Sequence, residues 1–321
     1  MSTQSTCKIN QDALGDPGIV REACKMEKCN LCPRHCGAER KAGQAGVCGA
    51  AGDQILAARA ALHMWEEPCI SGENGSGAVF FSGCPLRCIY CQNYQIAHVD
   101  VKKQITRNRL AEIFLELQEQ NAANINLVTP THYTPEIVWA LTRAREQGLV
   151  IPVVYNCSGY EKVETLKMLE GLVDIYLTDF KYMESELAAR FSKAPDYPEV
   201  AKAALAEMVR QIGTAEFSGD GMMKRGVIVR HLLLPNHVKI GKRVVEYVYK
   251  TYGDQVWLSL MNQYTPLPQV KDIPELNRRV TKREYENLIG YTLGLGVVNG
   301  FVQDGKTARE SFIPAFDYEG L

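Results

Sequence analysis

Residues 78–91 read AVFFSGCPLRCIYC and join a short apolar run to three closely spaced cysteines. The run at 78–82 shows no alternation of polar and apolar side chains, which is typical of a strand buried on both faces of a parallel sheet. Cys84, Cys88 and Cys91 follow it, four and three positions apart. Thiolates at these spacings can converge on one iron–sulfur cluster from a short loop. The stretch therefore predicts a parallel α/β fold with a metal-binding loop after its first strand.

The chain beyond this loop repeats the pattern of an apolar run followed by an amphipathic helix. In one such helix, Leu110, Ile113, Phe114 and Leu117 share a single face. Six strand-then-helix units in a row imply right-handed crossovers and parallel pairing. The predicted fold class is α/β, a partial parallel (β/α)6 barrel, and a doubly wound open sheet is the alternative. The predicted strands cover residues 78–82, 124–128, 150–155, 173–178, 227–234 and 255–261.

The first sixty residues depart from this pattern and are rich in cysteine. Four cysteines follow the spacing C-x2-C-x3-C-x11-C, namely Cys29, Cys32, Cys36 and Cys48. Four thiolates form a complete tetrahedral set for zinc or an iron–sulfur cluster, and four free cysteines are the alternative. Cys24 and His35 are spare ligands. We expect a small cysteine-rich N-terminal appendage at residues 1–60 and a barrel with a C-terminal extension at 61–321.

The charge and hydropathy of the chain exclude several classes of protein. The 36 Lys and Arg residues balance 37 Asp and Glu residues, which disfavours a nucleic-acid binder that depends on a basic field. The longest uncharged stretch, 287–303, contains four glycines and is too polar to cross a membrane. The first twenty residues lack the apolar region of a secretory signal, so we expect a cytoplasmic protein. In that reducing compartment, eleven cysteines favour metal ligation over disulfides.

The three cysteines of residues 84–91 have two alternatives to a cluster, a zinc loop and three buried thiols without a ligand. Zinc needs a fourth Cys or His to close its tetrahedron, and His98 is the only close candidate. The loop follows the first strand of the array, at the face where active sites of parallel α/β barrels gather. This position favours an iron–sulfur cluster in which one iron has no cysteine ligand.

The C-x3-C-x2-C spacing after the first strand of such an array resembles the radical S-adenosylmethionine (SAM) superfamily. Residues 81–93 are similar to the activating enzymes of glycyl-radical enzymes, closest to the pyruvate formate-lyase activating enzyme-like group. The resemblance implies an oxidoreductase in which Cys84, Cys88 and Cys91 hold a [4Fe–4S] cluster and SAM binds its open iron. The reduced cluster would cleave SAM to methionine and a 5′-deoxyadenosyl radical, which would abstract hydrogen from a glycyl-radical protein. Reduced flavodoxin or ferredoxin is the implied electron donor.

Polar side chains at the other predicted strand ends are the candidates for binding SAM. Asp179 and Lys181 match the Asp-x-Lys pair that helps to hold SAM in activating enzymes, because lysine suits a carboxylate and aspartate suits hydroxyl or amine donors. Thr129 stands where many relatives carry a Gly-Gly-Glu stretch that binds the SAM amino group, and this chain departs from that pattern. Asn156 is a pocket-lining candidate after the third strand. Gln263 is a candidate contact of the adenosine.

Two further functions stay open on the sequence alone. One is a radical SAM enzyme that modifies a small molecule, for which the long connection at 182–226 would build a lid over the substrate. The other is a non-catalytic iron–sulfur or zinc protein for interaction or electron transfer, which would bind a cluster without cleaving SAM. One complete cysteine set beside one that lacks a fourth ligand favours a reactive site plus an auxiliary site.

Overall fold

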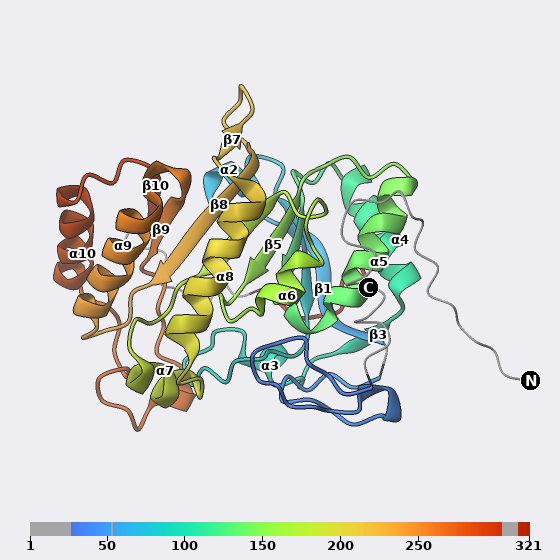
Figure 1. Cartoon of the computed structure of the whole chain (residues 1–321), viewed down its shortest axis with the longest axis horizontal. Helices are drawn as coiled ribbons and strands as arrows, with labels where there is room; N and C mark the ends of the chain where they lie inside the picture. The colour runs from blue at the N-terminus through green and yellow to red at the C-terminus, as the bar shows by residue number, and fades with distance from the viewer. Residues whose placement is uncertain (1–26, 53, 304–313) are drawn as a thin grey trace, which may run out of the picture.

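The computed structural model describes residues 27–52, 54–303 and 314–321. Its main element is a sheet with the strand order β10-β9-β8-β6-β5-β4-β2-β1-β3 (Figure 1). Over the described residues this path has two ends, at β10 and at β3, so the sheet is open. Within these described ranges, seven strands pair in parallel: β2 (Ser76–Phe81), β4 (Ile125–Val128), β5 (Val153–Cys157), β6 (Ile175–Asp179), β8 (Met223–Leu232), β9 (Trp257–Met261) and β10 (Gly300–Val302).

The six predicted strands correspond to β2, β4, β5, β6, β8 and β9. The prediction of six parallel strands missed β10, however, which pairs with β9 as a seventh parallel strand within the described residues. At the other edge, β1 (Ile55–His63) pairs antiparallel with both β2 and β3 (Lys103–Ile105). The short strand β7 (Glu216–Phe217) pairs antiparallel with β8. β3 and β10 have three residues each, which is too short for a hydrophobic period to reveal them.

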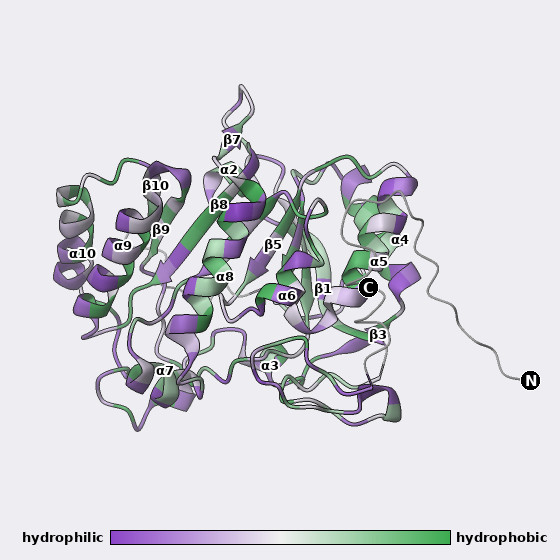
Figure 2. Ribbon diagram, in the orientation of Figure 1, coloured by the Kyte–Doolittle hydropathy of each residue, from purple (hydrophilic) through white to green (hydrophobic). Residues whose placement is uncertain are grey.

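Apolar side chains account for the burial of the central strands. Every residue of β2 and β4 is buried, as expected for strands without alternation. Helix α4 (Arg107–Glu119) buries the predicted face and packs against α5 (Thr134–Glu146). Figure 2 shows largely hydrophobic strands at the centre, with hydrophilic residues gathered on the outer helices.

The other helices are short or cover the remaining crossovers. They are α2 (Pro68–Ser71), α3 (Tyr94–Ala97), α6 (Val163–Lys167), α7 (Ser185–Ser192), α8 (Tyr197–Ile212), α9 (Val238–Tyr252) and α10 (Lys282–Gly294). A capping box starts α10: the Thr281 side chain accepts a hydrogen bond from the Glu284 backbone amide, and the Glu284 side chain accepts one from the Thr281 backbone amide. Four 3-10 turns complete the set over the described residues: η1 (Arg40–Ala42), η2 (Thr131–Tyr133), η3 (Gly253–Gln255) and η4 (Pro268–Val270).

Residues 27–52 form a loop-rich segment that contains η1 as its single regular element within the described residues. This N-terminal segment, dark blue in Figure 1, lies beside α3 and below the strands. It is tied to the rest of the molecule, because Thr165 Oγ1 donates to the Leu31 carbonyl over 2.7 Å. The main sheet begins with β1 at Ile55, so a domain boundary at residue 60 would fall inside a strand.

Candidate functional site

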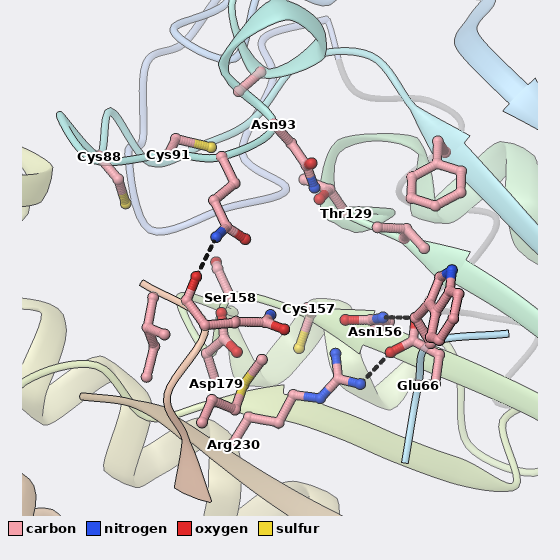
Figure 3. Close-up of a pocket in the computed structure, with 18 of the residues that line it drawn as sticks. Glu66, Cys88, Cys91, Asn93, Thr129, Asn156, Cys157, Ser158, Asp179 and Arg230 are labelled. Atoms are coloured by element: carbon pink, nitrogen blue, oxygen red, sulfur yellow. Dashed lines mark hydrogen bonds and ion pairs between the residues drawn. The ribbon is translucent and has the colours of Figure 1, made fainter. Parts of the chain in front are cut away.

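A pocket of about 350 Å³ opens at the carboxyl ends of the parallel strands. Figure 3 shows Cys88 and Cys91 at one end of it, with Glu66 and Arg230 at the other. Parallel strands bring their carboxyl ends to one edge, so side chains far apart in the sequence meet there. The structure places eight predicted residues on the wall of this one pocket: Cys84, Cys88, Cys91, Thr129, Asn156, Asp179, Lys181 and Gln263.

The cysteine loop (residues 83–91) is held in place by backbone hydrogen bonds to distant segments. The amides of Arg87 and Ile89 donate to the carbonyls of Ser192 and Phe191, at the end of α7. The connection at 182–226 therefore forms helices that support this loop, whereas the sequence suggested a lid. Gly83 has a φ of +99°, and a β-carbon there would lie 2.5 Å from the Cys48 carbonyl oxygen. Only glycine fits this close approach.

The three thiols of the cysteine loop belong to partly buried residues. Burial raises the pKa of Cys91 to about 12 and raises the pKa values of Cys84 and Cys88, while Lys181 opposes the shift at each. Ligation to a metal would remove these protons, since the thiolate is the ligand. Cys88 Sγ also lies 3.0 Å from Ser192 Oγ.

These thiols fit an iron–sulfur cluster better than a single zinc ion. His98, the fourth zinc ligand considered above, is exposed and lies outside the pocket. In residues 27–52, 54–303 and 314–321, no three Cys, His, Asp or Glu side chains converge closely enough to bind one metal ion. Ligand sulfurs around one zinc must come within about 4 Å of each other, because each Zn–S bond is about 2.3 Å. In a four-iron cluster, each cysteine instead binds a different iron and the sulfurs stand further apart.

Asp179 and Lys181 form an ion pair beside the cysteine loop. Lys181 Nζ lies 2.5 Å from Asp179 Oδ2, and both side chains are partly buried. Burial opposes the charge of Lys181, but the neighbouring Asp179 and Cys88 raise its pKa well above the ordinary value. The lysine is therefore a permanent cation within the pocket.

Thr129 and Gln263 line the pocket from the ends of β4 and β9. Thr129 has a φ of +59°, a left-handed conformation that is strained for a β-branched residue. Glycine adopts it freely, so the backbone here suits the Gly-Gly-Glu pattern from which the sequence departs. The Gln263 carbonyl accepts a hydrogen bond of 2.7 Å from Gln92 Nε2, which joins the end of the cysteine loop to β9.

The far end of the pocket carries three buried charged residues, which we call the charged floor: Glu66, Glu67 and Arg230. Arg230 Nη2 pairs with both carboxylates, and its Nε lies 2.8 Å from Glu67 Oε1. Glu66 Oε1 also accepts hydrogen bonds from Asn126 and Asn156. No local sequence signal places Glu66 and Glu67 in the pocket, because they reach it through the pairing of β1 with β2.

His132, in the turn after β4, and the described N-terminal cysteines do not line the pocket. His132 is buried and contacts the Ser82 carbonyl, and burial lowers its pKa to about 4, so it is a neutral structural residue. The four N-terminal cysteines belong to the segment at 27–52, while Cys24 lies outside the described residues. We call the former the N-terminal cysteine set, consisting of Cys29, Cys32, Cys36 and Cys48.

Comparison with known proteins finds a related domain around the cysteine loop. Residues 70–193 match the family described as a 4Fe-4S single cluster domain. This match contains all three cysteines of the loop and ends just after α7, which supports a [4Fe–4S] cluster at this loop. An uncharacterized protein of Methanocaldococcus jannaschii, MJ0674, is 29% identical over 275 residues, which cover 82% of this chain and 74% of that protein.

Two solved structures of SuiB from Streptococcus suis are more distant. The structure bound to the precursor peptide SuiA has a TM-score of 0.48 and 14% identity, over 69% of this chain and 46% of that one. The structure bound to S-adenosylmethionine has a TM-score of 0.46 and 12% identity, over 69% and 48%. This chain thus spans about half the length of the SuiB chain. None of the helices in the described part of this chain has the length and apolarity needed to cross a bilayer.

Proposed function

We propose that this chain is a radical SAM enzyme that uses a [4Fe–4S] cluster held by Cys84, Cys88 and Cys91. The observation that carries the proposal is the meeting of three partly buried thiols and the Asp179–Lys181 pair in a single pocket. The donor set is three thiols of a loop within a 4Fe-4S single cluster domain, and such a set leaves one iron free for a second ligand. When bound and reduced, the cluster supplies the electron that cleaves SAM to methionine and a 5′-deoxyadenosyl radical.

The protein's own residues bind and orient SAM. The Lys181 ammonium pairs with the SAM carboxylate, and Asp179 accepts hydrogen bonds from amine or hydroxyl groups. Thr129 and Asn156 offer a hydroxyl and an amide at the ends of β4 and β5. Apolar side chains on the same wall, among them Phe81 and Leu86, exclude water from the reacting groups.

The substrate that we propose is the backbone of a glycyl-radical protein. The support is the similarity of residues 81–93 and of the Asp179-x-Lys181 pair to activating enzymes. A small polar substrate is the second candidate. The charged floor favours it, because buried charges at the far end of a pocket suit a small molecule with charged or hydrogen-bonding groups.

Detection of 5′-deoxyadenosine tests the proposed reaction. The chain would be reconstituted anaerobically with iron and sulfide, reduced with dithionite and supplied with SAM. We expect 5′-deoxyadenosine from the wild type and from Cys69→Ala, which removes a buried thiol outside the pocket, but none from Cys88→Ala. Product from Cys88→Ala would overturn the assignment of the loop. A loaded cluster that never cleaves SAM, with any partner, would favour an electron-transfer protein.

Electron paramagnetic resonance tests the proposed substrate separately. Candidate glycyl-radical proteins would be mixed with the reduced enzyme and SAM, and a radical on the protein backbone would be sought. Because 5′-deoxyadenosine is measured in the same samples, SAM cleavage without a protein radical would reject the activase reading alone. A small-molecule substrate would then become the leading candidate.

A further inference from the structure

We propose that the charged floor, together with Asn156, binds a neutral amide-type group of the substrate, which offers a carbonyl oxygen and an N–H on one edge. The inference rests on the proposed function, because it concerns the far end of the same pocket. It assigns the free side-chain oxygen of Asn156 to the substrate and not to SAM. The chemistry of the substrate follows from which hydrogen-bonding atoms this end of the pocket leaves unpaired.

The register of the sheet places the recognising side chains on one face. Asn156 of β5 pairs with Leu177 of β6, and Asp179 of β6 pairs with Arg230 of β8. Leu177 and Asp179 are two positions apart on one strand, so their side chains point to the same face. The side chains of Asn156 and Arg230 therefore share this face as well. Both residues line the pocket.

Glu66 fixes the orientation of the Asn156 amide. A carboxylate only accepts hydrogen bonds, so Asn156 turns its Nδ2 to Glu66 Oε1, over 3.3 Å, and its Oδ1 away. Asn126 Nδ2 donates to the same oxygen over 2.9 Å, although this leaves Asn126 Oδ1 buried without a partner among the described residues. Glu66 thus sets the orientation of both amides. Asn156 Oδ1 remains as an acceptor on the pocket wall.

Glu66 and Glu67 fix the Arg230 guanidinium and leave one of its nitrogens free. Nε donates to Glu67, and Nη2 donates to both carboxylates. Within the described chain, no atom accepts a hydrogen bond from Nη1. Figure 3 shows one terminal nitrogen of Arg230 joined to Glu66 and the other turned away from it, toward the interior of the pocket. Nη1 is therefore a donor that faces the substrate.

The charges of the floor exclude an anionic partner for this donor. Two carboxylates stand against one guanidinium, so the floor carries a net negative charge. A carboxylate or phosphate at Arg230 Nη1 would be repelled by Glu66 and Glu67. A neutral carbonyl accepts from Nη1 without adding charge. An N–H beside that carbonyl would in turn donate to Asn156 Oδ1, and both free atoms of the site would then be paired.

Two kinds of substrate carry this edge. In a cyclic amide, the ring holds the carbonyl and the N–H of one amide side by side. In a peptide, one residue in extended conformation presents its own N–H and carbonyl to the same neighbour, as in an antiparallel sheet. The floor would therefore recognise either a small lactam or the backbone of a protein substrate by the same two hydrogen bonds.

Binding of matched neutral probes tests the inference. Ligand-observed NMR titrations would use the reconstituted, unreduced protein with SAM bound. The two pairs are 2-pyrrolidinone with γ-butyrolactone, and N-acetylglycine N-methylamide with its analogue in which oxygen replaces the glycine N–H. We expect at least one N–H probe to bind about 3- to 10-fold more tightly than its oxygen analogue. The pair that shows the difference assigns the source, a small lactam or a peptide backbone.

A pair of variants locates the effect. Asn156→Leu removes the proposed acceptor and should bring the affinity ratio of the two matched probes to about one. Asn93→Leu makes the same change at the cysteine-loop end of the pocket (Figure 3) and should leave the ratio unchanged. An unchanged ratio in Asn156→Leu would overturn the proposal.

The wild type alone decides the case in which Asn156→Leu fails to fold. Equal affinities within both pairs of probes would overturn the proposal, and so would tighter binding of acetate or inorganic phosphate than of the N–H probes. Probe binding as expected in a protein that cleaves no SAM would reject the proposed function alone. Cleavage of SAM without any preference for the N–H probes would reject this inference alone.

Discussion

Replacing Arg230 with methionine tests whether the charged floor is a set of paired buried charges. The substitution removes the only cation of the set and leaves Glu66 and Glu67 buried with no counter-charge from it. Removing one partner of a buried ion pair costs about 3–5 kcal/mol. Since Arg230 is itself only 8% exposed, little solvent can replace it. We expect the free energy of unfolding at pH 7 to fall by about 3–5 kcal/mol in urea titrations followed by circular dichroism.

The loss should depend on pH with a defined sign. In the wild type, burial opposes the charge of Glu67, but Arg230 lowers the pKa of this carboxyl below its ordinary value. The pairing therefore stabilises the fold above about pH 4.3 and is lost as the pH falls through the lowered pKa. In Arg230→Met the main effect that opposes burial is lost, so the pKa of Glu67 rises and the variant regains stability as the pH falls from 7 toward 5.

A charge-free variant provides the matched control. Glu66→Gln/Glu67→Gln/Arg230→Met leaves no unpaired charge, and we expect it to recover most of the stability that Arg230→Met loses. Two results would refute the reasoning. One is a loss below about 1 kcal/mol at pH 7, which is the range of exposed ion pairs. The other is an equal loss at pH 5 and pH 7.

Three further predictions concern the pocket, the cysteine loop and a buried carboxyl outside the pocket. Lys181→Met should weaken SAM binding to the reconstituted protein about 10- to 150-fold in equilibrium dialysis, the range for a lost charged hydrogen bond of about 1.5–3 kcal/mol; unchanged affinity would exclude the proposed carboxylate contact. Gly83→Ala should lower the free energy of unfolding by about 1–3 kcal/mol and reduce iron loading, because its β-carbon would meet the Cys48 carbonyl. Burial raises the pKa of the Glu161 carboxyl to about 8 in the folded chain. Between about pH 4.3 and pH 8 the unfolded chain therefore gives up this proton more readily than the folded chain does. Over this range the free energy of unfolding of the wild type should fall relative to that of Glu161→Gln, by at most about 1.4 kcal/mol per pH unit. Parallel unfolding curves for these two proteins across that range would contradict the burial of this carboxyl.

The parallel strands and the pocket wall could be predicted from the sequence because their signals are local. Uninterrupted apolar runs mark β2 and β4, and the residues that follow each run reach the same edge of the sheet by the rules of parallel pairing. For the same reason, the Asp179–Lys181 pair could be assigned to the pocket without knowledge of its contacts.

The charged floor could not be predicted because it depends on long-range pairing. Glu66 and Glu67 reach the pocket only because β1, just before them, pairs antiparallel with β2. The burial of β1 alternates only in part, and its partner strand β3 has just three residues. Arg230 depends on a local rule instead, because successive residues of β8 point to opposite faces of the sheet and only one of Arg230 and His231 can face the pocket. The structure puts His231 against the Phe180 carbonyl instead.

The support of the cysteine loop explains why its three thiols alone do not define the site. On one side, backbone amides of the loop donate hydrogen bonds to carbonyls at the end of α7. On another side, the amide of its first cysteine, Cys84, donates a hydrogen bond to the Cys48 carbonyl of the N-terminal segment. Arg34 joins these two supports, since it donates to Pro85 of the loop and to Ser192 of α7, which are 51 and 158 positions away in the sequence. A loop fixed on these sides presents its thiols to the remaining side, which is the pocket. The order of the N-terminal segment is therefore a condition for the geometry of the cysteine loop.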